Sequence, residues 1–350
     1  MSPQFRFAPS VLCFDRTPGF VVTPPWCKFR LQYTAFMRLL LFTLALFGWL
    51  PAETVLAEDA QTRLIKPVRD SYPQISPDGQ YIVFQSNRDG SNQIWLMQRD
   101  GSDLRQLTHA AGEGAETPGW SPDGQFIVYA AYLAEGNNDV FIMRPDGSDQ
   151  KQISNGPGYD GHPHWSADGQ RIVFNSDRDT PEPDAAWHLR WHDIWSVAPD
   201  GSGATKLTNC KSTCTFGSVS PDGSQLLYRR VDNSPGLNWV LEAGDRNSEI
   251  YVVPLSGGEA RNLSAHPAFD GWPQWSPDGQ WVVFASNRTG PPLTGQVWLV
   301  RPDGSDLQQI TQGSWAHVQP SFSPQGGSIL VYRHVETDEG ESGSIVEINH

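Results

Sequence analysis

Ser276-Pro277-Asp278-Gly279, followed one residue later by Trp281-Val282-Val283-Phe284, is the stretch that decides the fold, because variants of it recur along the chain. The tetrapeptide or a near variant occupies residues 76–79, 121–124, 166–169, 220–223, 276–279 and 323–326. The first three copies are 45 residues apart, and the later ones are separated by 47 to 56 residues. A repeat of this length is typical of the blades of a β-propeller.

Each copy belongs to a unit of four predicted strands joined by tight turns. In Pro77-Asp78-Gly79 the proline presets φ at the second turn position and the glycine accepts a positive φ. The runs on either side are apolar or alternate in polarity, as strands do. The four strands of the first unit are predicted at residues 73–76, 81–84, 94–97 and 104–108.

The number of units determines the predicted fold class. A single four-stranded sheet cannot bury two apolar faces, whereas six sheets packed around an axis bury all of them. The sequence therefore predicts an all-β protein, a six-bladed β-propeller over residues 62–350. The sixth unit ends with a third strand at 344–348, and 62–65 resembles the fourth strand of the first unit. We predict that this N-terminal strand closes the last blade, which removes an exposed sheet edge.

Residues 1–57 precede the repeats and do not share their pattern. Met37-Arg38 is followed by an apolar run, and Val55-Leu56-Ala57 offers residues that a signal peptidase reads. The run is short for a membrane span, so 37–57 is predicted to be a signal peptide cleaved near Ala57; an uncleaved anchor is the alternative. Residues 1–36 are interpreted as an extension from a mis-assigned start codon. We expect a periplasmic or secreted protein with no membrane span in its mature form.

Charge and cysteine content limit the function classes. The formal net charge is −14, which argues against binding to nucleic acid or to anionic lipid. Cys13 and Cys27 lie in the predicted leader, and Cys210 and Cys214 lie among the repeats. In an oxidising compartment the second pair is predicted to form a small disulfide loop. A single Cys-x₃-Cys pair is weak evidence for a metal site.

The variable loops predict where a binding site lies. Loops between the second and third strands, and between blades, differ in length, and such loops usually carry specificity. First strands should begin around the axial channel on that face. Before the proline of each first strand, or before Gly217 where glycine replaces it, stand Tyr72, Thr117, His162, Phe216, Trp272 and Gln319, and two residues earlier stand Asp70, Ala115, Asp160, Cys214, Asp270 and His317. We predict a pocket for a small polar or peptidic ligand, or for a cation held by carboxylates; loop residues without a ligand are the alternative.

Histidines give weak metal candidates. His188 and His192 are spaced i and i+4, as two ligands on one helix face would be, but the acidic partner of a His-Glu-x-x-His motif is missing. We expect this segment to be an insertion loop that presents Trp187 and Trp191. His162 and His317 are the channel candidates, and strand alternation is expected to send His162 and His164 to opposite faces. Arg88, Arg178 and Arg288 end three second strands alike and are expected to pair with neighbouring loop acids or carbonyls.

The repeats resemble a known family. Units of the form Pro-x-Trp-Ser-Pro-Asp-Gly…Ile-Val-Phe…Ser-Asn-Arg…Ile-Trp…Arg-Pro-Asp-Gly-Ser…Leu-Thr are similar to the WD40-like repeats of the TolB family, from about Thr62 to the C-terminus. This resemblance implies a six-bladed propeller in the bacterial periplasm. TolB proper acts in the Tol–Pal envelope system, binds the peptidoglycan-associated lipoprotein at its propeller, and carries an N-terminal α/β domain. We expect that domain to be absent here.

Two other resemblances define the enzyme alternative. Similar repeats cap serine peptidases of the prolyl oligopeptidase and tricorn kinds, but we find no Gly-x-Ser-x-Gly nucleophile elbow. The oligogalacturonate lyase propeller also resembles this chain and holds a metal through channel histidines, for which His162, His164 and His317 are loose counterparts. The sequence therefore favours a monomeric module that binds a protein or an envelope component and needs no cofactor. The alternative is a polysaccharide lyase or hydrolase with one divalent cation in the channel.

Overall fold

In the computed structural model the chain divides into two units, residues 1–64 and 65–350. The structure describes residues 68–134, 137–185, 190–232, 236–237, 243–244, 246–291, 293–337 and 340–349, all in the second unit. The predicted extension, signal peptide and N-terminal strand lie outside these residues, as do Trp187 and His188. Every regular element in the described ranges is a β-strand, and no membrane-spanning helix is found there.

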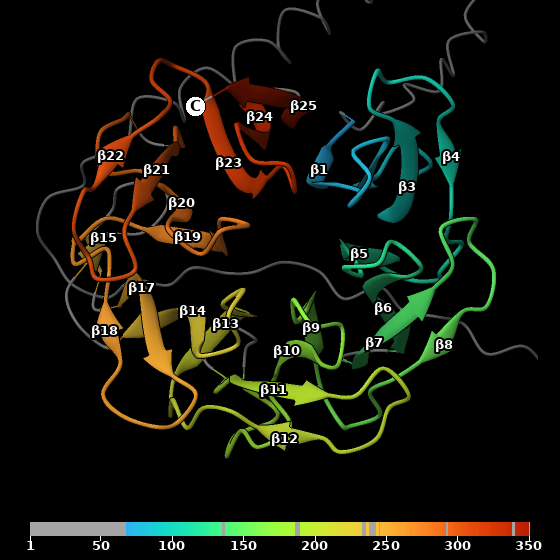
Figure 1. Ribbon diagram of the computed structural model, residues 1–350, viewed down its shortest axis with the longest axis horizontal. Coiled ribbons are helices and arrows are strands. Elements are labelled where there is room, and N and C mark those ends of the chain that lie inside the picture. Colours follow the sequence, from blue (N-terminus) through green and yellow to red (C-terminus); the bar gives the residue numbers. More distant parts are fainter. Residues whose placement is uncertain are drawn as a thin grey trace, which may run out of the picture. The chain divides into compact units, whose positions relative to one another are not determined.

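Six antiparallel sheets surround a central axis, and each is one blade (Figure 1). Blade 1 contains β1 (Asp70–Ile75), β2 (Tyr81–Ser86), β3 (Gln93–Gln98) and β4 (Arg105–Gln106). Blade 2 contains β5 (Ala115–Trp120), β6 (Ile127–Ala134), β7 (Asn137–Met143) and β8 (Lys151–Gln152). Blade 3 contains β9 (Asp160–Trp165), β10 (Ile172–Ser176), β11 (Asp193–Val197) and β12 (Thr205–Lys206).

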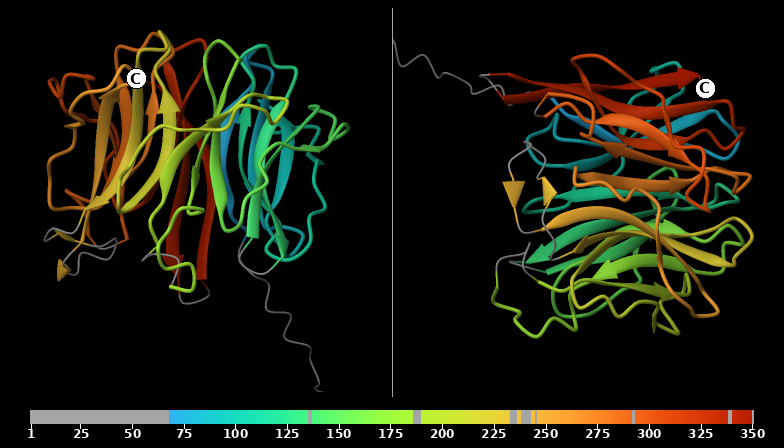
Figure 2. Two further views of the ribbon diagram at one scale, coloured as in Figure 1. Left: turned by 90° about the horizontal axis from the view of Figure 1, so that it is seen from below. Right: turned by 90° about the vertical axis from the view of Figure 1, so that its left-hand side faces the viewer.

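The second half of the ring repeats this order with one insertion. Blade 4 contains β13 (Thr213–Val219), β14 (Gln225–Asp232), β17 (Asn247–Pro254) and β18 (Arg261–Asn262). The small hairpin of β15 (Gly236–Leu237) and β16 (Ala243–Gly244) projects from it, at the end of the blade away from the C-terminus (Figure 2). Blade 5 contains β19 (Asp270–Trp275), β20 (Val282–Ser286), β21 (Gln296–Val300) and β22 (Gln308–Gln309). Blade 6 contains β23 (Ala316–Phe322), β24 (Ser328–Thr337) and β25 (Gly340–Asn349).

The Ser-Pro-Asp-Gly turns are held by the same hydrogen bonds in each copy that has the aspartate. In blade 1 the Ser76 hydroxyl donates to Asp78 Oδ1 at 2.5 Å and accepts from the Tyr81 amide at 2.9 Å. Asp78 Oδ1 also accepts from the Gln80 amide at 3.0 Å, and Gly79 has a φ of 76°. Serine and aspartate thus satisfy the backbone groups of the turn, which is why the tetrapeptide recurs.

The apolar second strands form the interior between blades. In β2, five of the six side chains are buried, as the sequence predicts. Val83 and Leu96 of blade 1 pack with Ile127 and Tyr129 of blade 2 in one continuous cluster. Each fully buried side chain of this kind contributes about 1.5–3 kcal/mol relative to an exposed one. Contacts between neighbouring blades therefore hold the ring together.

Blade 6 meets blade 1 through several side-chain contacts. The Arg99 guanidinium pairs with the Glu347 carboxylate of β25. Gln325, which replaces the turn aspartate in the sixth copy, donates from Nε2 to the Pro77 carbonyl at 2.9 Å. The described part of blade 6 has three strands, so closure by residues 62–65 stays a prediction.

Cys210 and Cys214 are joined by a disulfide where the chain passes from blade 3 to blade 4. Their Cα atoms are 6.3 Å apart. Cys214 is fully buried and packs with Val173 and Ile194 of blade 3 and with Leu226 of blade 4. The bridge therefore links the connecting segment to the interface between these two blades.

Candidate binding site in the axial channel

One residue in the first strand of every blade has a left-handed backbone. Its φ is 52° at Tyr72, 51° at Thr117, 49° at His162, 56° at Phe216, 53° at Trp272 and 52° at Gln319. Such angles are uncommon outside glycine and cost about 1–2 kcal/mol per residue. Because all six occupy the same repeat position, we interpret the conformation as a feature of the fold.

The left-handed residue lies in a β-bulge. In blade 1, Ser71 pairs with Gln85 and Gln74 pairs with Val83, so Tyr72 and Pro73 together oppose one residue of β2. A bulge of this kind redirects a side chain out of the regular alternation. The same register shift occurs in the other five blades. Each bulge directs one side chain toward the propeller axis.

The structure corrects one sequence expectation. His162 and His164 were expected on opposite faces, but both imidazoles line the same channel cavity. That expectation misapplied the alternation, because residues i and i+2 of a strand share a face. The pairing of β9 with β10 shifts at this point.

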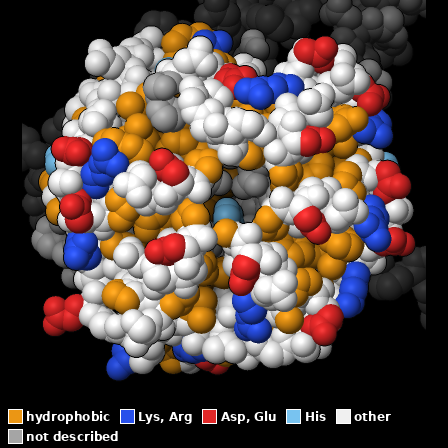
Figure 3. Space-filling view, viewed as in Figure 1, with side chains coloured by type: hydrophobic (Ala, Val, Ile, Leu, Met, Phe, Trp, Pro, Cys, Tyr) orange, Lys and Arg blue, Asp and Glu red, His pale blue; other side chains and the backbone are white. Residues whose placement is uncertain are grey.

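The six left-handed residues and their successors line a cavity on the axis with about 80 Å³ of space accessible to water. Figure 3 looks along the axis and shows a histidine side chain in the central opening, surrounded by hydrophobic side chains. No Asp, Glu, Lys or Arg lines this cavity. Its side chains belong to Tyr72, Pro73, Gln74, Thr117, Pro118, His162, Pro163, His164, Phe216, Ser218, Trp272, Pro273, Gln274, Gln319, Pro320 and Ser321.

Hydrogen bonds between blades fix the positions of the lining residues. The Tyr72 amide donates to Gln319 Oε1 at 3.0 Å, which links blades 1 and 6. The Thr117 amide donates to Gln85 Oε1 at 3.1 Å, which links blades 2 and 1. Trp272 Nε1 donates to the Tyr72 hydroxyl at 3.3 Å, so a residue of blade 5 contacts one of blade 1. The site is therefore ordered before any ligand binds.

Aromatic rings continue around the other half of the channel. The His162 and Phe216 ring centroids are 3.9 Å apart, and those of Phe216 and Trp272 are 6.4 Å apart. The ring centroids of Tyr159 and His162 are 6.1 Å apart. Such rings offer large apolar contact areas that lose little conformational entropy on binding.

Burial keeps the channel side chains uncharged. It lowers the pKa of His162 to about 3, although a hydrogen bond at 2.7 Å between Nδ1 and Asn175 Oδ1 acts in the opposite direction. Burial also lowers the pKa of the His164 imidazole, whose Nδ1 lies 2.8 Å from the Trp165 carbonyl oxygen. The pKa of Tyr72 is raised to about 12 by burial. At neutral pH all three groups are therefore neutral.

A second cavity, with about 460 Å³ of space accessible to water, forms a mouth next to the left-handed layer. It shares Tyr72, Trp272 and Gln319 with the first cavity. Glu116 lines it and accepts from the Tyr159 hydroxyl at 2.6 Å and from Asn138 Nδ2 at 3.1 Å. Burial raises the pKa of the Glu116 carboxyl.

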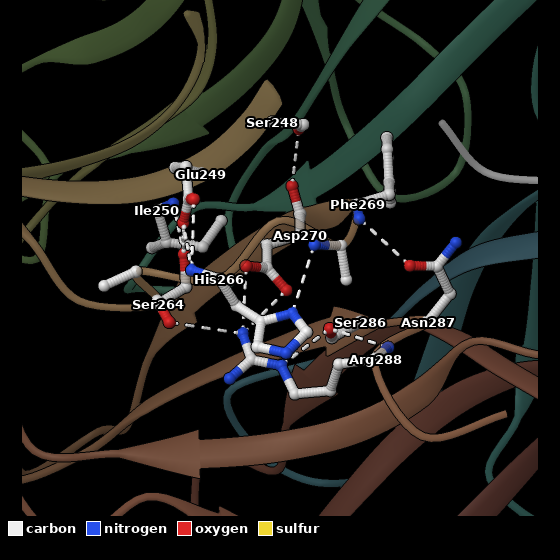
Figure 4. A network of polar contacts seen from close by, with 12 residues as sticks. Ser248, Glu249, Ile250, Ser264, His266, Phe269, Asp270, Ser286, Asn287 and Arg288 are labelled. Carbon is white, nitrogen blue, oxygen red and sulfur yellow. Dashed lines mark hydrogen bonds and ion pairs between the residues drawn. The ribbon is translucent and has the colours of Figure 1, made fainter. Parts of the chain in front are cut away.

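The three predicted aspartates have partners within their own blades. Asp270 and Arg288 form an ion pair at 2.9 Å, and Asp70–Arg88 and Asp160–Arg178 are the equivalents at 2.7 and 2.6 Å. This confirms the expected pairing of the three arginines. Figure 4 shows Arg288 between Asp270 and Ser286 in a polar network that includes Glu249, Ser264 and His266. None of the three aspartates lines either cavity.

The remaining predicted residues are spread over the propeller. His317 is half-buried with Nδ1 3.3 Å from Gln296 Oε1, and burial lowers its pKa. Trp191 is 37% exposed, and His192 is buried against Tyr159 with ring centroids 6.1 Å apart. The described part of the chain contains no group of three or more His, Cys, Asp or Glu side chains arranged to hold a metal ion.

Sequence reasoning missed several lining residues. Gln74, Ser218, Gln274 and Ser321 all stand two positions after a left-handed residue, so their fixed place in the repeat was the available signal. Because residues i and i+2 of a strand share a face, this spacing would have placed the residues two positions on beside the predicted ones. Glu116, which lines the mouth cavity, was also missed, although it directly precedes the predicted Thr117.

Comparisons with known proteins agree with the fold. The sequence profile described as "TolB beta propeller domain" matches residues 114–245 and 232–347, together more than half of the chain. An uncharacterised protein of Agrobacterium fabrum is 27% identical over 201 residues, which are 48% of this chain and 64% of that protein. A TolB homolog of Chlorobium luteolum is 28% identical over 52% of this chain and 36% of its own length.

The solved structure of TolB from Acinetobacter baumannii is similar at a TM-score of 0.54 and 21% identity, over 73% of this chain and 57% of that one. The chain thus spans less than two thirds of the length of these relatives. A likeness at this identity shows the fold alone. The profile match, which covers the repeats themselves, shows that the chain belongs to the TolB beta-propeller domain family.

Proposed function

We propose that the propeller is a binding module that takes an extended segment of a protein, or of another cell-envelope component, into its axial channel. The supporting observation is the layer of six left-handed residues, which directs Tyr72, His162, Phe216 and Trp272 to one uncharged cavity. Aromatic rings and side-chain amides suit a peptide, because rings pack on its side chains and amides match its backbone groups. Large aromatics in such a position are the usual anchors of binding.

The proposed compartment is the periplasm or the exterior. Its support is the leader pattern at 37–57 and the disulfide between Cys210 and Cys214, which persists in oxidising compartments. A role linked to the Tol–Pal envelope system is the finer form of the proposal. Its support is membership of the TolB beta-propeller domain family.

Position-specific photocrosslinking tests the proposal. A photoreactive amino acid replaces Thr117 in the channel of the full chain, or Ser305 in an exposed turn of blade 5 as the outer control. We expect a crosslinked envelope partner from position 117 alone. Trp272→Ala should abolish the adduct, whereas Leu307→Ala, at an exposed site in blade 5, should leave it unchanged. Equal adducts from both positions would contradict binding in the channel.

The polysaccharide-active enzyme stays a separate prediction from the sequence. It requires a divalent cation bound by His162 or His317, and activity that His162→Ala or His317→Ala abolishes. Elemental analysis of the full chain, purified without chelator, tests it directly. A stoichiometric metal ion would favour the enzyme over the binding module.

A further inference from the structure

The second strand of each blade places one residue beside the bulge, opposite the residue that precedes the left-handed one. In blade 4 this is Arg229, which pairs with Thr215 as Gln85 pairs with Ser71 in blade 1. The equivalent residues in the other blades are Gln85, Ala130, Asn175, Ala285 and Tyr332. Blade 4 alone has a charged side chain at this position.

The Arg229 side chain is held in place from two sides. Nε donates to the Ser248 hydroxyl at 2.7 Å, and that hydroxyl donates to the Asp270 carbonyl at 2.7 Å. The guanidinium lies 5.0 Å from the centroid of the Phe269 ring, which lines the mouth cavity. A Cβ on Gly271 would lie 2.8 Å from the Phe269 ring and 3.9 Å from Arg229 Cδ, so glycine leaves room for this packing.

Arg229 has no acidic partner among the residues that the structure describes. Its neighbour Arg230 does have one, since Arg230 Nε lies 2.6 Å from Asp232 Oδ1. Burial and the nearby Arg246 lower the pKa of Arg229 to about 10, so the guanidinium is still charged at neutral pH. A partly buried cation without a counter-charge is costly, and an anionic ligand would remove that cost.

The surroundings of Arg229 suit a carboxylate. The fixed Nε bond leaves the two terminal amino groups as a fork, which matches the two oxygens of a carboxylate. The Arg229 charge acts on Tyr72, where it lowers the pKa against the larger effect of burial. The Tyr72 hydroxyl accepts a hydrogen bond from Trp272 Nε1, so its own proton can be donated to a ligand. This cationic position is set in a chain of net charge −14, where nonspecific attraction of anions is absent.

We propose that Arg229 binds the carboxylate of an Asp or Glu side chain of the partner peptide at the channel mouth. The inference rests on the proposed function and names the chemistry of its ligand. The peptide backbone would run along the uncharged channel, with its acidic residue toward blade 4. Arg229 is not among the residues that line the mouth cavity, but Gln85 and Tyr332, at the same repeat position, and Phe269, against which the guanidinium packs, do line it.

Selection from a displayed library of random peptides tests the inference. Peptides selected on the full chain should carry Asp or Glu at one fixed position. The enrichment should disappear with Arg229→Gln and persist with Arg230→Gln, whose arginine is adjacent and already paired. For one selected peptide, Arg229→Gln should weaken binding by about 10- to 100-fold, as expected for a hydrogen bond to a charged group. Arg229→Lys should give an intermediate loss, because the charge remains and the fork is gone.

The outcomes separate the inference from the proposed function. Channel-dependent peptides without acidic enrichment would overturn the inference and leave the binding function standing. Binding of digalacturonate that Arg229→Gln abolishes, with no peptide selected, would overturn the assignment to a peptide and would contradict the binding function as well. Thermal unfolding of each variant checks that Arg229→Gln is folded. A variant that loses acidic selectivity while it still binds other selected peptides would support the inference even if its stability is reduced.

Discussion

The Asp270 carboxylate and the Arg288 guanidinium form an ion pair at 2.9 Å in the interior of blade 5, with Asp270 fully buried. Arg288 Nε also donates to the Ser286 hydroxyl at 2.9 Å. The guanidinium lies 5.1 Å from the Trp298 ring centroid and 5.4 Å from that of Phe284. Blades 1 and 3 repeat this arrangement, so it joins the start of the first strand to the end of the second in alternate blades.

Removal of Arg288 should destabilise the propeller strongly. Arg288→Met leaves Asp270 buried without its counter-charge, and we expect the free energy of unfolding to fall by about 3–5 kcal/mol. Arg105→Met removes an exposed arginine that lies 3.5 Å from Asp103 and should cost less than about 1 kcal/mol. Urea unfolding of both variants measures the difference. Equal losses would show that burial does not govern the contribution of this pair.

The turn aspartates predict loss of stability in acid. Hydrogen bonds from the Ser220 hydroxyl and the Ser224 amide lower the pKa of Asp222 from 3.8 to about 2. Because the carboxyl has a lower pKa in the folded state than in the unfolded state, it stabilises the fold at pH values above 3.8. This stabilisation is lost as the pH falls from 3.8 to about 2. Asp222→Asn should therefore flatten the dependence of unfolding free energy on pH between about 4 and 2. An unchanged slope would contradict the assignment to this carboxylate.

The channel imidazole should not titrate in the physiological range. Since burial lowers the pKa of His162 to about 3, its ring stays neutral between about pH 5 and pH 8. We expect its NMR signal to keep a constant shift over this range in the free protein. A midpoint for His162 near the unperturbed value would mean that water enters the channel freely.

The disulfide should contribute modestly to stability. Cys210 and Cys214 close a short loop, for which chain entropy predicts about 2 kcal/mol. A reductant should lower the unfolding free energy of the natural chain by this amount. The double variant Cys210→Ala/Cys214→Ala should not respond to reductant. Equal sensitivity of both proteins would place the effect outside this bridge.

The repeat made the architecture predictable from sequence. Turn residues at fixed offsets and apolar second strands specify each blade locally, and such local agreement needs no knowledge of distant contacts. The six residues before the proline of each first strand, or before Gly217 in blade 4, were also predicted to surround the channel, and their side chains line one cavity. The part of the site that depends on position within the repeat could therefore be predicted from the sequence.

The remainder depends on backbone conformation and on pairs of residues distant in sequence. No propensity rule gives a non-glycine residue a positive φ, so the left-handed bulge at His162 was missed. Asp270 was predicted at the channel, but it pairs with Arg288, which follows 18 residues later, just after β20. No sequence pattern singled out Arg229, because its proposed role depends on residues that are distant in sequence, such as Phe269 and Tyr72.

Thr117 should be a site of stored backbone strain. It is the one β-branched residue among the six left-handed positions, and its φ of 51° brings Cβ close to its own backbone. Its buried hydroxyl also has no hydrogen-bond partner in the described structure. Glycine accepts this conformation, so Thr117→Gly should raise the free energy of unfolding by about 1 kcal/mol. Thr215 directly precedes the left-handed Phe216 of blade 4 and has no positive φ, so Thr215→Gly should lower the free energy of unfolding. Destabilisation by both substitutions in urea unfolding would mean that packing of the Thr117 methyl group outweighs the strain.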